Sequence, residues 1–189
     1  SPFMTAAGLD KSPTSSWVIS AALMGLAWFH LANDPARQLR SLVLPGHFFG
    51  CIGQMLPAAM GAVAASGNKP HVLCDGDASV MMHIGEFETA VSYGMPLMVV
   101  CLNNQALGSE YYKFDAHKMK ADLATVASPD LGAVGKAFGG RGRLVRSVDE
   151  LRSATREFLE NPAPTMLDVR ISRSVITLPY RRIHYGQDE

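Results

Sequence analysis

The chain has 189 residues, with 17 Lys plus Arg against 17 Asp plus Glu, so its formal net charge is zero. This length suits one domain with a modest extension and excludes two full-size domains, while the balanced charge argues against a nucleic-acid or anionic-membrane partner held by bulk electrostatics. Hydrophobic residues make up 48% of the chain and charged residues only 18%, which predicts a substantial core and a surface that favours a large protein contact.

The first third of the chain opens with an irregular segment and then shows helical patterns. Two prolines and several Ser and Thr predict a linker or arm over residues 1–16. An aromatic and β-branched run at 17–20 predicts a strand, and the apolar stretch at 21–31 predicts a helix. Residues 58–65 are expected to form a further helix with Pro57 in its first turn. Its side chains are small on every face, so we expect burial on all sides.

Strand and helix patterns alternate from residue 71 onward. Strands are expected at 71–75, 97–102, 143–145 and 166–171, and helices at 84–93, 130–138 and 148–159. The stretch rich in Tyr, Lys and His between residues 103 and 129 shows no pattern, and we expect irregular chain there. Alternation of this kind predicts parallel strands joined by right-handed crossovers. The expected fold class is α/β, a parallel sheet flanked by helices, with residues 173–189 as a C-terminal tail that needs a surface to lie on.

The cysteines and the charge-free stretches bear on the compartment. Cys51, Cys74 and Cys101 share no C-x-x-C spacing and lie in apolar surroundings, so we expect buried thiols in a reducing compartment. The charge-free stretches at 12–33 and 41–68 are each interrupted before they reach the ~20 apolar residues of a spanning helix. The sequence therefore predicts a soluble, cytoplasmic protein.

Two short polar segments follow two of the expected buried strands. Asp77 stands within Gly76-Asp77-Ala78-Ser79, just after the strand at 71–75, and Asn104 comes just after the strand at 97–102. Ligands of open parallel sheets bind beyond the carboxyl ends of the strands, so these side chains converge if the strands are neighbours. Their oxygens and a backbone carbonyl supply part of the shell of Mg²⁺, which phosphate oxygens and water complete. The small residues around Asp77 let backbone N–H groups approach a phosphate. The residues alone therefore indicate a Mg²⁺-bridged diphosphate without saying which one.

The same segments resemble the fingerprint of thiamine diphosphate-dependent enzymes. The motifs that carry the resemblance are Gly76-Asp77-Ala78-Ser79, Gly85-Glu86-Phe87-Glu88-Thr89-Ala90, Asn103-Asn104, Gly50-Cys51-Ile52-Gly53 and Leu56-Pro57-Ala58-Ala59. The first three are similar to a G-D-G or G-D-A start that is closed by Asn, here 27 residues after the Asp. The last two are similar to a stretch of acetolactate synthases and related 2-oxo-acid decarboxylases. The resemblance covers residues 17–172 and implies the three-layer diphosphate-binding (PP) domain of this family.

The resemblance implies a role for several residues of the site. Asp77 and Asn104 would give side-chain oxygens to Mg²⁺, and Ala106 its backbone carbonyl. Ile52 matches the large apolar residue that holds the cofactor bent, and Gly50 the glycine whose carbonyl receives the amine of the aminopyrimidine. The cofactor-binding residues that the resemblance implies are Gly50, Ile52, Gly76, Asp77, Ala78, Ser79, Met82, Asn104, Ala106, Leu107 and Gly108.

Contacts to a substrate are candidates at three further positions. His47 precedes the Ile52 segment, His83 follows Met82, and Glu110 follows the second motif. A structural role is the alternative for both histidines. The glutamate that activates the cofactor in this family lies on a separate pyrimidine-binding (Pyr) domain, and no glutamate here stands in that context. The chain would therefore supply half of an active site, with no catalytic residue of its own assigned.

The implied function is that of a Mg²⁺- and thiamine diphosphate-binding domain of an acetolactate synthase-like enzyme, a lyase or transferase that decarboxylates or joins 2-oxo acids. We expect the chain alone to be inactive and to need a Pyr domain, on the same full-length protein or on a separate subunit. We also expect a homo-oligomer and no nucleic-acid or membrane partner. The alternatives are a subunit of a two-subunit 2-oxo-acid decarboxylase and a non-catalytic diphosphate-binding α/β module.

Overall fold

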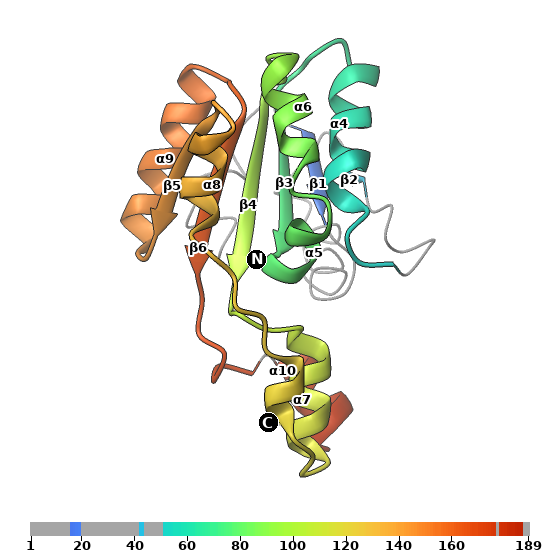
Figure 1. Cartoon of the computed structure of the whole chain (residues 1–189). Helices are drawn as coiled ribbons and strands as arrows, with labels where there is room; N and C mark the ends of the chain where they lie inside the picture. Colours follow the sequence, from blue (N-terminus) through green and yellow to red (C-terminus); the bar gives the residue numbers. More distant parts are fainter. Residues whose placement is uncertain (1–15, 20–41, 44–50, 177, 187–189) are drawn as a thin grey trace, which may run out of the picture.

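A parallel β-sheet forms the centre of the fold. The computed structural model describes residues 16–19, 42–43, 51–176 and 178–186. The strands are β1 (Ser16–Ile19), β2 (Leu42–Val43), β3 (His71–Gly76), β4 (Leu97–Asn103), β5 (Arg141–Val145) and β6 (Thr165–Arg170). Their order is β2-β1-β3-β4-β6-β5, and every neighbouring pair is parallel (Figure 1). The expected α/β class with a parallel sheet is confirmed.

Helices cover both faces of the sheet. The helices are α4 (Met55–Ala65), α5 (Asp77–Met82), α6 (Glu86–Ser92), α7 (Gly108–Ala116), α8 (Leu131–Ala137), α9 (Val148–Glu160) and α10 (Leu178–Tyr180), together with the 3-10 helix η2 (Ala121–Ala124) and the π-helix η3 (Arg181–Tyr185). One buried apolar cluster joins α4, α5, α6 and α8 to one face of the sheet, and a second joins α9 to the other face. Alternate residues of β3 and β4 belong to the two clusters, which is why these strands are apolar throughout. The result is three layers.

Close backbone contacts hold α8 against the edge of the sheet. A Cβ on Gly142 of β5 would lie 1.9 Å from the carbonyl oxygen of Gly132 in α8, and a Cβ on Gly135 would lie 2.5 Å from the Cβ of Met166. Only glycine allows the helix to approach this closely. This contact also explains why β5 begins two residues earlier than expected, because Arg141 and Gly142 pair with β6 beneath α8.

Side-chain caps confirm two expected helix starts. Ser147 accepts the N–H of Glu150 while the Glu150 carboxylate accepts the N–H of Ser147, a capping box at the start of α9. Asp130 accepts the N–H of Ala133 and begins α8 in the same way. Both helices therefore start where the sequence predicts them.

The stretch after β4 departs from expectation, and the C-terminal tail lies on the surface that this stretch forms. The segment expected to be irregular contains α7 and η2, and the tail folds as α10 and η3 on α7, beyond the carboxyl ends of the strands (Figure 1). The Tyr112 and Tyr180 rings lie 5.5 Å apart, and Tyr185 donates its hydroxyl to Asp115 Oδ2 over 2.6 Å. Tyr112 is the single buried residue of α7. The helix therefore has no apolar stripe for periodicity to detect.

Two expectations about burial are wrong. Cys51 is exposed, whereas Cys74 and Cys101 are buried as expected. In α4, Gly61 and its neighbours Ala64 and Ala65 are exposed, because the helix buries only its sheet-facing side. Within the described residues, no helix has the length and apolar character needed to cross a membrane.

Some expectations fall outside the described residues. These include the helix at 21–31 and the two candidate site residues His47 and Gly50. The expected linker at 1–16 falls outside as well, except that Ser16 begins β1.

Candidate functional site

A cleft lies at the carboxyl ends of β3 and β4, which are neighbours in the sheet. Gly76, the last residue of β3, pairs in register with Leu102 of β4, so the loops that follow both strands start side by side. The cleft is open to solvent, and its about 740 Å³ of empty space includes part of that solvent. The predicted site residues that line the cleft are Ile52, Gly76, Asp77, Ala78, Ser79, Asn104, Ala106, Leu107, Gly108 and Glu110.

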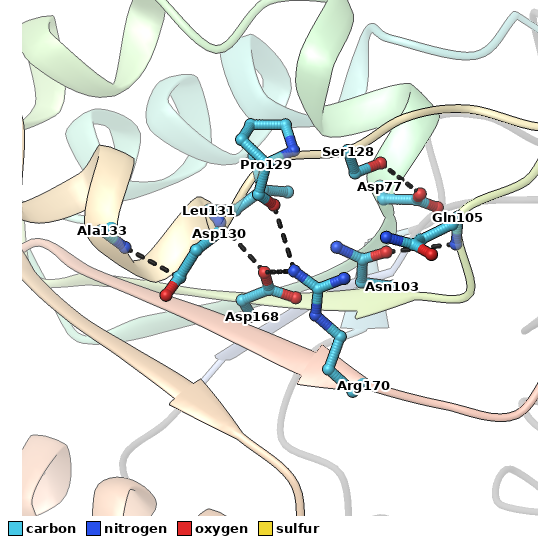
Figure 2. A network of polar contacts seen from close by, with 10 residues as sticks. All are labelled: Asp77, Asn103, Gln105, Ser128, Pro129, Asp130, Leu131, Ala133, Asp168 and Arg170. Atoms are coloured by element: carbon cyan, nitrogen blue, oxygen red, sulfur yellow. Dashed lines mark hydrogen bonds and ion pairs between the residues drawn. The ribbon is translucent and has the colours of Figure 1, made fainter.

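Asp77 begins α5 directly after β3, and its side chain is only 1% exposed. Ser128 donates its hydroxyl hydrogen to Asp77 Oδ2 over 2.6 Å (Figure 2). Burial raises the pKa of Asp77, and the hydrogen bond from Ser128 opposes part of that rise. A buried carboxylate beside a cleft is costly unless a cation or hydrogen-bond donors compensate it. Asp77 therefore suits a metal ligand.

Asn104 follows β4, and its side chain is held by its own loop. Oδ1 accepts the N–H of Ala106 over 3.1 Å, and the Tyr112 side chain forms a hydrogen bond with Asn104. A Cβ on Gly108 would lie 3.0 Å from Nδ2, so Gly108 leaves the room that the amide occupies. Gln105 has a φ of +58°, which turns the chain sharply between Asn104 and Ala106. The amide oxygen is thus oriented by contacts on both sides of the group.

Asn103 differs from its neighbour. It is 1% exposed, and its Oδ1 accepts the N–H of Gln105 over 3.1 Å. This bond to the N–H two residues further on is typical of an asparagine that forms a turn. Of the two, only Asn104 lines the cleft.

The hydroxyl of Ser79 is engaged within the protein. It donates to Asp75 Oδ2 over 2.5 Å and accepts the N–H of Gly53 over 2.9 Å. Asp75 in turn accepts the N–H of Gly76 through Oδ1 over 2.8 Å. These bonds tie the loop that carries Ile52 to the end of β3. A contact between Ser79 and a diphosphate would therefore use its backbone N–H, which lies in the first turn of α5.

Met82 and His83 do not line the cleft. Met82 is 54% exposed. A Cβ on Gly53 would lie 3.0 Å from Met82 Sδ and 3.2 Å from His83 Nδ1, and Gly53 itself has a φ of +88°. Both side chains thus pack against the loop that carries Ile52. The cofactor contact of Met82 and the substrate contact of His83 stay predictions.

Three residues of this region were missed by sequence reasoning. Ser128 contacts Asp77, Tyr112 contacts Asn104, and Tyr180 of α10 lines the cleft and bonds the Ser109 side chain. No local pattern marks the two tyrosines. For Ser128 the available signal is its place directly before Pro129-Asp130, the start of a helix.

The donor set agrees with a hard cation. Among the residues that the structure describes, no group of three or more His, Cys, Asp or Glu side chains is placed to hold a metal ion. The predicted donors are of another kind: one carboxylate, one amide and the carbonyl of Ala106. Mg²⁺ accepts such partial oxygen shells and completes them with phosphate oxygens and water. The residues present therefore fit a Mg²⁺–diphosphate group.

The fold and the cleft define an α/β domain that binds a ligand beyond the carboxyl ends of two neighbouring parallel strands. Residues 25–169 match the family described as "Thiamine pyrophosphate enzyme, C-terminal TPP binding domain". The chain therefore belongs to the thiamine pyrophosphate enzymes and corresponds to their C-terminal, cofactor-binding domain.

Acetolactate synthases are among the relatives in sequence. The large subunit from Parasynechococcus marenigrum (strain WH8102) is 33% identical over 148 residues, which cover 76% of this chain and 23% of that protein. The mitochondrial catalytic subunit from Saccharomyces cerevisiae is 30% identical over 141 residues, which cover 74% of this chain and 20% of that protein. The chain thus spans less than a quarter of the length of these relatives.

Solved structures with the same fold include decarboxylases. Benzoylformate decarboxylase from Polynucleobacter necessarius has a TM-score of 0.73 at 22% identity, covering 94% of this chain and 34% of that one. The thiamine diphosphate-dependent 4-hydroxybenzoylformate decarboxylase from Rhodococcus jostii RHA1 has a TM-score of 0.72 at 21% identity, covering 90% of this chain and 32% of that one. At these identities the likeness establishes the fold, and it confirms the expected three-layer architecture.

Proposed function

We propose that this chain is the Mg²⁺- and thiamine diphosphate-binding domain of an acetolactate synthase-like enzyme that decarboxylates or joins 2-oxo acids. The observation that carries the proposal is that Asp77 and Asn104 line one cleft after two neighbouring strands. Asp77, Asn104 and the backbone carbonyl of Ala106 would hold Mg²⁺. The backbone of Ala78 and Ser79, at the start of α5, would approach the diphosphate.

The chain's contribution to the reaction is binding and orientation. When bound, thiamine diphosphate supplies the acidic ring carbon that adds to the carbonyl of a 2-oxo acid. Ile52 lines the cleft and is 45% exposed, so its side chain is available to pack against the cofactor. The bonds from Gly53 through Ser79 to Asp75 hold its loop in place. Glu110 lines the same cleft and is a candidate for a substrate contact.

A partner that covers the cleft is part of the proposal. Ile52 and Ile171 both line the cleft and are 45% and 40% exposed. Apolar side chains exposed at the mouth of a site favour a covering protein surface. We assign that surface to a Pyr domain, on the same full-length protein or on another subunit, which would also supply the activating glutamate. A cytoplasmic homo-oligomer completes the proposal.

Calorimetric titration with thiamine diphosphate, in Mg²⁺ and in EDTA, tests this function. We expect weak, Mg²⁺-dependent binding by the chain, and a loss of at least ~10-fold in affinity for Asp77→Ala, because even outer-shell changes at metal sites cost this much. Asp149→Ala on α9, whose side chain is 90% exposed, is the matched control and should bind like the wild type. Thermal unfolding of each variant verifies the fold.

Three outcomes would contradict the proposal. Unchanged binding by Asp77→Ala would show that Asp77 does not hold the metal ion. Tighter binding of a flavin or an adenine nucleotide would favour a non-catalytic module. Rapid decarboxylation of pyruvate by the chain alone would show that no Pyr domain is needed.

A further inference from the structure

Residues 126–131, which we call the bridging segment, follow η2 in the chain. They run from beside the loop that follows β4 to the start of α8. At the first end, Val126 donates its N–H to the carbonyl of Gln105 over 2.9 Å. Just before it, Thr125 forms an antiparallel bridge with Ala106. The bridging segment is therefore attached to the same loop that presents Asn104 and Ala106 to the cleft.

The other end of the bridging segment is attached to β6. Asp168 Oδ2 accepts the N–H of Leu131 over 3.0 Å, and Arg170 Nη2 donates to the carbonyl of Pro129 over 3.2 Å (Figure 2). Asp168 and Arg170 also form an ion pair of 2.8 Å, in which the Asp168 side chain is fully buried and the Arg170 side chain is 23% exposed. A buried ion pair is favourable only when further hydrogen bonds satisfy its charges. Here Asp168 Oδ2 and Arg170 Nη2 each form such a bond with the backbone of the bridging segment, while the buried Asp168 Oδ1 and Arg170 Nε form no hydrogen bond within the described residues.

Ser128 lies in the middle of the bridging segment and faces Asp77. It is 7% exposed, its N–H donates to the carbonyl of Val126 over 2.9 Å, and its hydroxyl donates to Asp77 Oδ2 over 2.6 Å. A serine hydroxyl carries a single hydrogen, so the Asp77 carboxylate receives the one donation that Ser128 can make. With both ends of the segment attached, the direction of this bond is set by the surrounding structure.

We propose that Ser128 is a positioning residue for the metal site: it holds one carboxylate oxygen of Asp77 so that the other is presented to Mg²⁺. The Asp168–Arg170 pair acts one step further out, because it holds the bridging segment that carries Ser128. The inference rests on the proposed function, since it gives Ser128 a role toward the ion that Asp77 would bind. Mutation of a hydrogen-bond partner of a metal-ligating carboxylate commonly lowers metal affinity by ~10–100-fold.

The test is a Mg²⁺ titration of the chain at a fixed, high concentration of thiamine diphosphate. We expect Ser128→Ala to weaken Mg²⁺ binding at least ~10-fold, and Ser128→Thr, which keeps the hydroxyl, to restore most of the affinity. Arg170→Gln, which leaves Ser128 in the chain but loosens the bridging segment, should weaken binding less than Ser128→Ala. Ser92→Ala is the matched control, because Ser92 donates to the exposed Glu88 carboxylate over 2.5 Å outside the cleft. It should bind Mg²⁺ like the wild type.

Asp77→Ala in the same titration separates the two levels of inference. If Asp77→Ala and the wild type behave alike, the proposed function fails and this inference fails with it. If Asp77→Ala loses binding while Ser128→Ala binds like the wild type, only the role of Ser128 is overturned. Equal losses for Ser128→Ala and Ser128→Thr, with unfolding temperatures that match the wild type, would also overturn it, because the hydroxyl would not be the group that matters. Wild-type affinity in Arg170→Gln would overturn the part assigned to the ion pair.

Discussion

The two side chains proposed to hold Mg²⁺ are kept in place in opposite ways. Asp77 is 1% exposed, and its hydrogen-bond donor Ser128 lies 51 residues further along the chain. Asn104 is only half-buried, and its partners Ala106 and Tyr112 belong to its own loop and to the helix that follows. Asp77 also accepts hydrogen bonds from backbone N–H groups, those of Ala78 and Gln105 among them. The position of Asp77 therefore depends in part on how distant elements pack, whereas the position of Asn104 depends on a local turn.

The two side chains should therefore be displaced by substitutions in different parts of the chain. Changes close to Asn104 in sequence should move its amide and leave the fold intact, because the loop is attached to the end of β4 and supports little of the core. Asp77 responds to changes on α8 and β6, since those elements hold the bridging segment. A buried carboxylate is also sensitive to losing a donor, because hydrogen bonds offset the cost of burying its charge. Three variants test this difference between Asp77 and Asn104, and the expected effect declines from one variant to the next.

Gly108→Ala should have the largest effect on the local side of the comparison. The added Cβ would lie 3.0 Å from Asn104 Nδ2, so the amide must move, and we expect Mg²⁺ binding to weaken ~10-fold or more. Titration with Mg²⁺ in the presence of thiamine diphosphate measures this. Gly61→Ala in α4, where a Cβ meets nothing within 4 Å, is the control and should leave binding unchanged. Wild-type affinity in Gly108→Ala would show that the amide is not held by its loop.

Tyr112→Phe should have a smaller effect on the same ligand. It removes the hydroxyl that bonds Asn104 but keeps the ring that packs on Tyr180. A hydrogen bond of this kind is worth ~0.5–1.5 kcal/mol, so a loss of about 2–10-fold in Mg²⁺ affinity is expected in the same titration. Tyr93→Phe, at a ring that is 73% exposed, provides the control. A larger loss of Mg²⁺ affinity than in Ser128→Ala would show that the Tyr112 hydroxyl contributes more to the metal site than the Ser128 hydroxyl does.

Asp77→Asn should make the metal-free protein slightly more stable. Because burial raises the pKa of Asp77, the native state binds the proton more tightly than the unfolded state. The free energy of unfolding therefore falls as pH rises from the ordinary Asp value of about 3.9 through the raised pKa. Asparagine carries no charge, so the free energy of unfolding of the variant does not fall in this way. The midpoint of thermal unfolding of the variant in EDTA at pH 7 should lie a few degrees above that of the wild type, where ~1 kcal/mol corresponds to ~2–4 °C.

The advantage of Asp77→Asn should vanish at a pH below about 3.9, where the carboxyl group is neutral in both states. Asp122→Asn, at an exposed carboxylate, should change the midpoint at neither pH. An unchanged or lower midpoint for Asp77→Asn at pH 7 would show that the donors around Asp77 already offset the cost of burying its charge.

Much of this protein was determined by the sequence alone. The alternation of strands and helices, the caps at Ser147 and Asp130, and the apolar strands β3 and β4 identify the α/β fold, because periodicity and capping act over a few residues. The motifs around Asp77 and Asn104 follow the ends of those strands, and parallel pairing places such ends at one edge of the sheet. Their appearance in one cleft needs only that β3 and β4 are neighbours.

What the tertiary structure alone decided lies in contacts between segments far apart in the sequence. The helix α7 carries one buried residue, and the tail covers it through Tyr180, so neither shows an apolar repeat. Ser128 reaches Asp77 from a segment whose ends are bonded to the carbonyl of Gln105 and to the Asp168 and Arg170 side chains. A hydrogen bond over 51 residues leaves no local pattern, since its geometry is set by the packing of α8 and β6 and not by the residues beside it.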